Sequence, residues 1–313
     1  MGMNFFRFFR LFSSVRTSVP ASTSSYNFLK YDIPSYAPIG LIAGNGYFPL
    51  ACAKEARALG HKVVAVCHQG ETSDEIIELV DFASWVKVGE LGRTINIFKE
   101  QGVSFVAMAG GISRVRSFRD VKLDLRGSAL LLRLRSAKDD VIMRGIADEL
   151  LSEGIEVFPC THFLSSWITP EGVLTRLKPT VEQSNDISIG VSALKAMSSE
   201  DIGQLVVVRD GVIVSVEAVE GSDAAILRGG SLGGQGTVIV KCAKITQDMR
   251  FDVPTAGIKT LETISNAGGS VLAIEAGRSI LMDKEKFLKE ADRRKICVVG
   301  IPSLVTDTLA VGK

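Results

Sequence analysis

The sequence predicts an α/β protein, in which an N-terminal Rossmann-like domain with a parallel sheet precedes a C-terminal mixed α/β domain. Short apolar runs alternate with helical patterns from residue 39 to about residue 110. Two of these runs end directly in glycine turns, as strands of parallel sheets often do. Beyond residue 165 the helical patterns become fewer and a hairpin signal appears. At 313 residues the chain is long enough to build both cores without disulfides or a structural metal.

The N-terminal domain is predicted from repeated strand-helix units. Pro49 stands where a first helix would begin, and Gly60 stands where it would stop. The valine-rich run that follows is short enough to be a second buried strand. The predicted strands are residues 39–43, 61–67, 83–88 and 105–109, and the predicted helices are residues 50–59, 75–80 and 93–101.

In the C-terminal domain, Arg209-Asp210-Gly211 joins two valine-rich runs and predicts a hairpin. The predicted strands are residues 204–208, 212–217, 238–242, 271–274 and 296–299, and the predicted helices are residues 259–266 and 284–291. The change of pattern places the boundary near residues 155–170. We therefore expect domains at residues 37–165 and 166–313, after an extension at residues 1–36.

The extension has a biased composition. Residues 1–31 are rich in Ser, Thr and Phe, contain Arg7, Arg10 and Arg16, and have no acidic side chain before Asp32. This composition is typical of an organellar transit peptide. A helix lying on a membrane surface and a disordered leader fit it as well. We exclude the segment from the predicted fold.

Composition excludes some classes of function. The 36 Lys and Arg residues balance 35 Asp and Glu residues, so overall charge gives no reason to expect nucleic acid as a partner. No apolar run reaches the roughly 20 residues that span a bilayer. The five cysteines are scattered without CxxC spacing, which favours reduced core cysteines and a reducing compartment.

Two glycine loops are expected at one edge of the N-terminal sheet. The first contains Gly46 and leads into a helix, so its amides can face a phosphate. The second contains Gly110 and Gly111 and adds the hydroxyl of Ser113 and the guanidinium of Arg114. Each loop alone could be a plain tight turn. Together they suggest a nucleotide cleft.

Acidic side chains supply candidate metal ligands. Asp139 and Asp140 open a helical stretch, where they could cap the helix or hold a divalent cation beside a pyrophosphate. Asp252 lies between apolar neighbours just before Pro254, which makes it a candidate metal ligand or general base. It could instead cap the turn before the next helix. A denser acidic set follows a valine-rich strand and consists of Glu217, Glu220 and Asp223.

Covalent catalysis is disfavoured. His61, His68 and His162 stand in no Ser-His-Asp or Cys-His arrangement, and neither GxSxG nor HExxH occurs. His162 follows a strand end and could touch a ligand or be a structural histidine. We therefore expect metal-assisted attack by water.

Seven motifs resemble a known family in the order in which they occur. They are IGLIAGNGYFPL, AGGISR, KDD, DIGQ, VEAVEGSDA, RFDVPTAGI and EAGR, and they extend over roughly residues 38–302. This series resembles the LpxI family of UDP-2,3-diacylglucosamine pyrophosphatases. The resemblance implies a substrate held between two domains. It also implies Mg²⁺-dependent hydrolysis to UMP and 2,3-diacylglucosamine 1-phosphate in lipid A biosynthesis, with water directed at the β-phosphorus.

By motif, Asp252 corresponds to the family's essential aspartate, with a role in metal binding or activation of water. The matching substrate loops contain Gly46, Gly110, Gly111, Ser113 and Arg114, and Asp139 and Asp140 match an acidic pair of the family. Beside the resemblance, His162 and Thr255 are further candidate substrate contacts, and the candidate metal ligands are Asp252, Asp139, Asp140, Glu217, Glu220 and Asp223. Lys138 replaces a glycine expected before the acidic pair, and Gly111 stands where Asn is common. These departures weaken the assignment of the phosphate contacts more than they weaken the assignment of Asp252.

The resemblance also implies partners and a location. The substrate carries two acyl chains, so peripheral contact with membrane lipid is expected, as is a cytoplasmic location at the inner membrane. An organellar, mitochondrial location is the alternative if residues 1–31 act as a transit peptide. A homodimer is also compatible with the sequence.

Two rival functions stay open. One is a binding protein that captures lipid-sugar nucleotides without cleaving them. The other is a nucleotide-dependent oxidoreductase. The second lacks the acidic residue expected about 20 positions after the first glycine turn, because Val66, Cys67 and His68 occupy that region.

Overall fold

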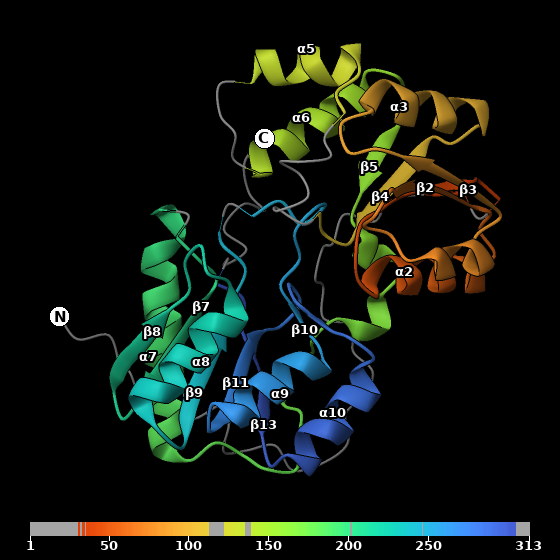
Figure 1. Ribbon diagram of the computed structural model, residues 1–313. Coiled ribbons are helices and arrows are strands. Elements are labelled where there is room, and N and C mark those ends of the chain that lie inside the picture. Colours follow the sequence, from red (N-terminus) through yellow and green to blue (C-terminus); the bar gives the residue numbers. More distant parts are fainter. Residues whose placement is uncertain are drawn as a thin grey trace, which may run out of the picture. The chain divides into compact units, whose positions relative to one another are not determined.

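The predicted two-sheet α/β architecture is present in the computed structural model, shown as a ribbon in Figure 1. The structure describes residues 31, 33–34, 36–112, 122–134, 139–200, 202–245 and 247–304. The side chains of Asp139, Asp140 and Ser199 lie outside this description. The expectations for residues 1–30 therefore fall outside the described residues. Both sheets belong to one compact unit that starts at Tyr31.

The N-terminal sheet has five parallel strands in the order β3-β2-β1-β4-β5, which matches the first five strands of the Rossmann order. The predicted strands lie within two residues of the observed ones at either end. The strands are β1 (Ile39–Ala43), β2 (Val63–His68), β3 (Phe82–Val86), β4 (Phe105–Ala109) and β5 (Glu156–Phe158).

Both faces of this sheet are covered because its strands are apolar on both sides. Helix α2 (Phe48–Ala58) packs on one face with Leu41 and Ala65, and α3 (Leu91–Glu100), α5 (Leu125–Arg133) and α6 (Asp139–Leu151) pack on the other with Val64 and Val106. The segment predicted as a helix at residues 75–80 is the 3-10 helix η1 (Asp74–Leu79). Two further 3-10 turns, η2 (Cys160–His162) and η3 (Ser165–Trp167), follow β5.

The C-terminal sheet is mixed. Its order is β6-β13-β11-β9-β7-β8, in which β9, β11 and β13 run parallel while β7, β8 and β6 pair antiparallel. Its strands are β6 (Gly172–Val173), β7 (Leu205–Arg209), β8 (Val212–Val216), β9 (Thr237–Lys241), β11 (Gly269–Glu275) and β13 (Cys297–Ile301). A separate two-stranded sheet joins β10 (Thr255–Ala256) to β12 (Ile280–Leu281).

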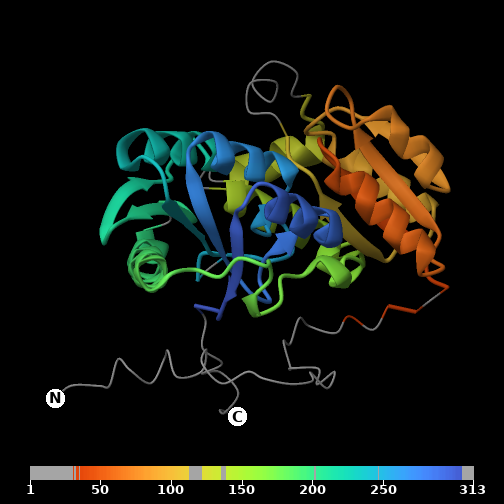
Figure 2. The same cartoon turned by 90° about the horizontal axis from the view of Figure 1, so that it is seen from below.

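The expectation of fewer helices after residue 165 is wrong. Among the described residues from 165 to 304, four α-helices cover the sheet. They are α7 (Val181–Met197), α8 (Ser222–Gly233), α9 (Ile258–Asn266) and α10 (Lys284–Arg293), and η4 (Ser198–Glu200) follows α7. Helix α7 packs on one face, while α8, α9 and α10 pack on the other. In Figure 2 the green α7 lies across the strands from the teal and blue α8 and α9.

The two missed helices have physical reasons. Helix α7 contains few residues of high helix propensity, but a capping box between Thr180 and Gln183 fixes its start. Helix α8 contains Gly229 and Gly230, which weaken a helix prediction. A Cβ at Gly230 would lie 2.1 Å from the carbonyl oxygen of Ala267, so close packing against the neighbouring chain requires the glycine. Tertiary contact therefore overrides local propensity.

The predicted hairpin is confirmed and is held by a buried carboxylate. Asp210 and Gly211 both have positive φ, 48° and 83°. Asp186 on α7 is only 2% exposed and accepts hydrogen bonds from the amides of Asp210 at 3.1 Å and Gly211 at 2.7 Å. Helix α7 thereby fixes the turn between β7 and β8. This turn lies near the start of β9, at the opposite end of the sheet from Lys241.

We expect Asp186→Ala to lower the free energy of unfolding by about 2 kcal/mol, because two amides lose a charged acceptor. Urea unfolding followed by circular dichroism measures this change. The exposed Asp210→Asn is a matched control, since Asn tolerates positive φ. A drop no larger than that of Asp210→Asn would contradict the role given to Asp186.

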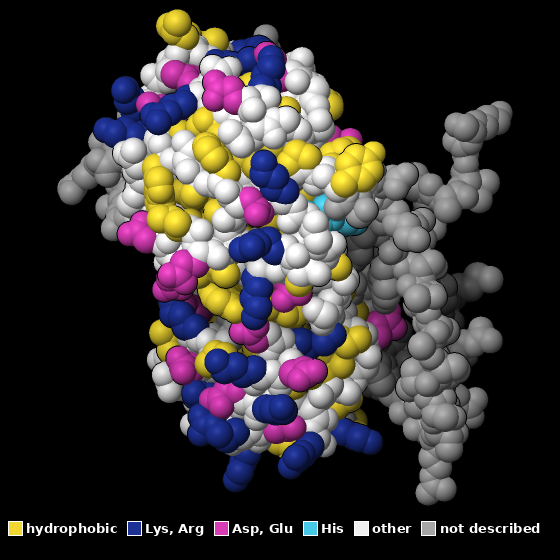
Figure 3. All heavy atoms as spheres, turned by 90° about the vertical axis from the view of Figure 1, so that its right-hand side faces the viewer, with side chains coloured by type: hydrophobic (Ala, Val, Ile, Leu, Met, Phe, Trp, Pro, Cys, Tyr) yellow, Lys and Arg dark blue, Asp and Glu magenta, His cyan; other side chains and the backbone are white. Residues whose placement is uncertain are grey.

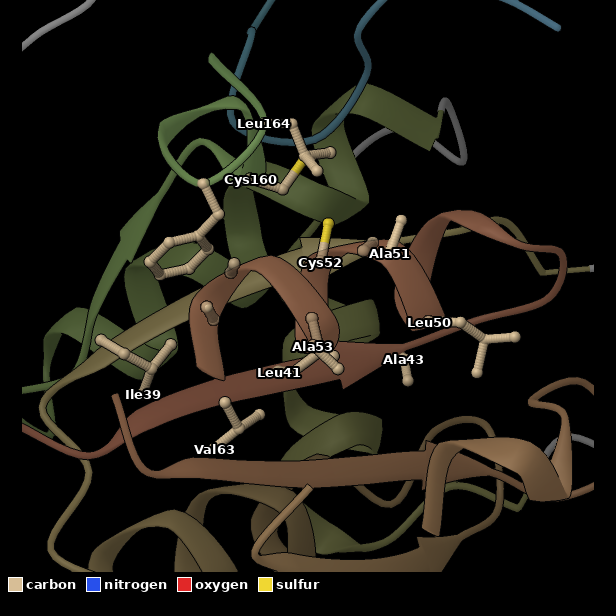
Figure 4. Close-up of a cluster of buried hydrophobic side chains, with 14 of the residues drawn as sticks. Ile39, Leu41, Ala43, Leu50, Ala51, Cys52, Ala53, Val63, Cys160 and Leu164 are labelled. Atoms are coloured by element: carbon tan, nitrogen blue, oxygen red, sulfur yellow. The ribbon is translucent and has the colours of Figure 1, made fainter. Parts of the chain in front are cut away.

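All five cysteines are free and buried, as predicted. Figure 4 shows Cys52 of α2 and Cys160 in the same apolar cluster as Ile39, Leu41 and Leu164. The hydrogen bond between the two thiols, followed by burial, raises the pKa of Cys52 well above its ordinary value. Such thiols are unreactive core residues.

Charge on the surface is mixed. Basic and acidic side chains are interspersed over the face shown in Figure 3. Within the residues that the structure describes, no helix combines the length and apolar character needed to cross a bilayer.

Candidate active site at the carboxyl edges of the sheets

The two predicted glycine loops meet at one edge of the N-terminal sheet. β1 and β4 are neighbouring parallel strands that end together, at Ala43 and Ala109. An antiparallel bridge then joins Asn45 to Gly111, with the Asn45 amide donating to the Gly111 carbonyl at 2.7 Å. Gly44 and Gly110 leave no space for side chains, because a Cβ at Gly44 would lie 2.3 Å from the Gly111 carbonyl oxygen and a Cβ at Gly110 would lie 2.4 Å from the Asn45 carbonyl oxygen. Gly110 also has a φ of +82°. These contacts confirm the predicted juxtaposition.

A third loop joins this edge and was missed from the sequence. Glu71 follows β2, and its carboxylate accepts a hydrogen bond from the Asn45 side chain at 2.9 Å. Thr72 donates to the carbonyl of Ala43 at 2.6 Å, and His68 lies 3.1 Å from the same oxygen. The carboxylate therefore lies after the second strand, near the place where dinucleotide-binding proteins carry their ribose-binding acid. The sequence signal was a Glu three residues beyond the strand end instead of at it.

The segment that carries Asp252 is anchored on the N-terminal domain by its neighbours. Phe251 packs against the core cluster on one face of the N-terminal sheet, and Val253 packs against the cluster on the other face. Asp248 also pairs with Arg144 of α6 at 3.7 Å. Asp252 itself is exposed, and its carboxylate accepts a hydrogen bond from Gln247 at 2.6 Å. Apolar contacts thus fix the chain on both sides of an exposed carboxylate.

A buried lysine lies at the matching edge of the C-terminal sheet. Lys241 ends β9 and donates to the Ser222 hydroxyl at 3.3 Å and to the Thr255 carbonyl at 3.1 Å. Burial lowers the pKa of Lys241, and the carboxylates of Glu217, Asp252 and Asp223 act in the opposite direction. The structure therefore brings three of the predicted acids into the electrostatic surroundings of one ammonium group.

Each of these acids has its own partners. Glu217 is 7% exposed and accepts from Ser222 at 2.9 Å and from the Gln204 amide at 3.3 Å. Asp223 lies in the first turn of α8, not in a turn after the strand as expected, and pairs with Lys259 at 3.1 Å. Sequence analysis missed Lys241, although a Lys that ends an otherwise buried apolar strand was a usable signal.

Comparison with known proteins decides the family. The family model for the LpxI N-terminal domain matches residues 38–167, and the model for the LpxI C-terminal domain matches residues 170–299. The chain belongs to the LpxI family. This confirms the resemblance drawn from the seven motifs.

One curated relative supports this membership. The UDP-2,3-diacylglucosamine pyrophosphatase LpxI of Caulobacter vibrioides is 31% identical over 274 residues, which cover 84% of this chain and 97% of the relative. Among solved structures, the biotin carboxylase subunit of pyruvate carboxylase has a TM-score of 0.26 at 13% identity. That match covers 55% of this chain and 34% of the other, and it carries no argument.

The other predicted site residues of this LpxI-family chain do not all lie near Lys241 or the glycine loops. Ser113 and Arg114 lie outside the described residues, as do the side chains of Asp139 and Asp140 at the start of α6. Glu220 pairs with Arg228, which lies on the same helix as Asp223. Thr255 contributes its carbonyl to Lys241, while its hydroxyl donates to the Val253 carbonyl at 2.8 Å.

His162 belongs to an aromatic cluster of the N-terminal domain. Its ring packs edge-on against Phe158, with centroids 5.9 Å apart, and against Phe163 at 5.4 Å. Burial lowers the pKa of His162, and His61 lowers it further. Its substrate contact stays a prediction.

The described carboxylates could supply only part of the ligands of a divalent cation. Among the described residues, no group of three His, Cys, Asp or Glu side chains converges on a metal position. Mg²⁺ is usually held by one or two carboxylates together with waters and substrate phosphate oxygens, instead of a full protein cage. The exposed Asp252 and the partly exposed Asp223 fit that limited role.

A separate hollow lies away from these groups. It has a volume of about 520 Å³ and is lined by Arg176, Leu177, Lys289, Asp292, Arg293 and Lys295. None of these residues belongs to the glycine loops or to the surroundings of Lys241.

Proposed function

We propose that this chain hydrolyses the pyrophosphate bond of UDP-2,3-diacylglucosamine to UMP and 2,3-diacylglucosamine 1-phosphate, in a reaction that depends on Mg²⁺. The proposal is supported by the LpxI relative from Caulobacter vibrioides, because the match covers 97% of that relative and 84% of this chain. The observation that carries it within the molecule is Asp252, an exposed carboxylate whose neighbours Phe251 and Val253 pack on the N-terminal domain. This arrangement supports a carboxylate aimed at a ligand of that domain.

In this proposal the N-terminal loops bind the nucleotide end of the substrate. The backbone amide of Gly46 and those at the start of α2 can donate to phosphate oxygens, while the amides of Gly44 and Asn45 hold the turn against β4 and Gly111. Asn45 holds Glu71 in the loop after β2, where a carboxylate can accept from ribose hydroxyls. The exposed Tyr47 beside this turn stacks on Trp167, with ring centroids 6.4 Å apart, and this stack stiffens the start of the helix.

Asp252 is the proposed base or orienting group for water. Water attacks one phosphorus, the bond from that phosphorus to the bridging oxygen breaks, and the proton of the water passes to the carboxylate. Asp252 and Asp223 would hold Mg²⁺ together with substrate oxygens, and Asp139 and Asp140 stay further candidates. When bound, Mg²⁺ neutralises charge on the diphosphate and polarises the phosphoryl group. Lys241 adds a fixed positive charge nearby.

The direct test is purified full-length protein with UDP-2,3-diacylglucosamine, with products identified by mass spectrometry. We expect UMP and 2,3-diacylglucosamine 1-phosphate, and we expect EDTA to lower the rate by about 100-fold or more, because the diphosphate loses its neutralising cation. Excess MgCl₂ should restore the rate. Full activity in EDTA would exclude the metal, and release of no UMP at any Mg²⁺ concentration would exclude the reaction.

Reaction in ¹⁸O-labelled water distinguishes the two phosphorus atoms. Label in 2,3-diacylglucosamine 1-phosphate would mean attack on the β-phosphorus, as the family resemblance implies. Label in UMP would mean attack on the α-phosphorus. Binding of the substrate without turnover would favour the lipid-sugar-nucleotide binding protein, and tight binding of NAD or FAD would favour the oxidoreductase.

We also propose that the protein works in peripheral contact with a cytoplasm-facing membrane, because its substrate carries two acyl chains. Fractionation of cells that express the full chain tests this location. Recovery in mitochondria would instead support a transit peptide at residues 1–31. Sedimentation analysis of the purified protein determines whether it is a homodimer.

A further inference from the structure

Lys241 occupies a place where a lysine requires an explanation. It is only 6% exposed and ends β9, every residue of which is buried. Transfer of an ammonium group out of water is unfavourable unless hydrogen bonds and opposite charges compensate it. An apolar residue would serve the sheet at least as well, so the lysine points to a role beyond packing.

The contacts of Lys241 join three segments that are distant in the sequence. Its ammonium donates to Ser222 at the start of α8, and Ser222 in turn donates to Glu217 after β8. It also donates to the carbonyl of Thr255, which is three residues beyond Asp252. The buried ammonium therefore links the segment that carries Asp252 to the turn between β8 and α8.

The charges around Lys241 complete this arrangement. Glu217, Asp252 and Asp223 are the carboxylates that act on its ammonium, and Asp223 also pairs with Lys259 at 3.1 Å. Without Lys241 the mutual repulsion of the acids would displace the exposed one most easily.

We propose that Lys241 is a positioning residue, which fixes the segment of residues 252–255 against the Glu217–Ser222 turn and thereby sets the place of the Asp252 carboxylate. Its kinetic consequences rest on the proposed function. The ammonium acts through Asp252 and does not itself need to touch the substrate. This role makes Lys241 and Asp252 a coupled pair.

The kinetic test compares Lys241→Met, Asp252→Asn and the double variant with the wild type. We expect Lys241→Met to lower kcat by about 100-fold, because a carboxylate displaced by about 1 Å loses that much. KM should stay within about threefold, and half-saturation by Mg²⁺ should move to higher concentration. The double variant should be no slower than Asp252→Asn alone. If the loss in kcat of the double variant equals the product of the two single losses, the proposal is overturned.

The matched control separates positioning from general stability. Asp186→Ala alters the same sheet at its opposite end, far from the Lys241 contacts. It should lower the denaturation midpoint more than Lys241→Met does and leave kcat within about twofold. If Asp186→Ala lowers kcat as much as Lys241→Met, the lysine is merely structural and the proposal fails.

A second readout does not depend on activity. In hydrogen exchange of the folded protein, we expect amides of residues 251–257 to exchange about tenfold faster in Lys241→Met than in wild type or Asp186→Ala. Unchanged exchange overturns the proposal. If the wild type does not hydrolyse UDP-2,3-diacylglucosamine, the proposed function fails, while the exchange result still decides the role of Lys241.

If Lys241→Met does not fold, Ser222→Ala provides the alternative variant. It removes the side-chain partner of the ammonium and creates only a small change in volume. We expect kcat to fall by about tenfold, since the link from Lys241 to Glu217 is lost. The same variant should raise exchange in residues 251–257. No change in either measurement overturns the proposal.

Discussion

Asp252→Asn is expected to lower kcat for hydrolysis of UDP-2,3-diacylglucosamine by about 10³-fold. The amide keeps the shape of the side chain and one oxygen that can accept from Gln247, so the segment keeps its place. It loses the negative charge needed to hold a cation or take a proton from water. Loss of a positioned acid or base typically costs about 10²- to 10⁴-fold in rate. The steady-state rate of UMP release measures the effect.

The control for Asp252→Asn is the same change at Asp210. Asp210 is an exposed carboxylate in the β7–β8 hairpin, on the opposite end of the sheet. Its conversion to Asn should leave kcat within about twofold, because surface substitutions away from special features have small effects. Substrate binding by Asp252→Asn should persist, since the glycine loops are intact. Turnover at the wild-type rate would remove Asp252 from the mechanism.

Glu275→Ala is expected to lower the free energy of unfolding by about 3 to 5 kcal/mol, the range seen when one member of a buried ion pair is removed. Glu275 has no exposed surface and ends β11. It accepts from the Ala243 amide at 2.7 Å, the Ser303 hydroxyl at 2.7 Å and the Leu304 amide at 3.0 Å. It also pairs with Arg278 at 3.4 Å. One carboxylate therefore holds the segments that follow β9 and β13.

Urea unfolding followed by circular dichroism measures the Glu275 effect across the whole fold. Fluorescence serves as a second signal from the N-terminal sheet, because both tryptophans, Trp85 and Trp167, pack in the core cluster on one face of that sheet. The exposed Glu285→Ala in α10 is the control and should change stability by less than about 1 kcal/mol. If the urea midpoint of unfolding of Glu275→Ala equals that of the wild type, Glu275 does not hold the segments that follow β9 and β13.

The local pattern of the chain predicted much of the fold. Strands β1, β2, β4 and β9 were expected within two residues at each end, because continuous apolar runs bounded by Gly, Pro or polar residues leave few alternatives. The β7–β8 hairpin was predicted for the same kind of reason. Positive φ at Asp210 and Gly211 is a local property that turn residues signal directly.

Helices α7 and α8 could not be predicted in that way. Their Ser, Asn and Gly residues lower intrinsic helix propensity, and the glycines of α8 are required by neighbours distant in the sequence. Local pattern therefore assigned too few helices to the C-terminal half. The sheet and the adjacent chain stabilise these helices through contacts that the sequence does not display.

The sequence by itself determined the family and the two glycine turns, and it predicted Asp252 as a site residue, because each lies in a contiguous motif with its own local signal. Only the tertiary structure decided which charged groups act together. It joined Lys241 to Ser222 and Thr255 and placed Glu217, Asp252 and Asp223 in the electrostatic surroundings of the same ammonium. Coulombic and hydrogen-bonding partners depend on distance in space, and strand pairing sets that distance independently of separation along the chain.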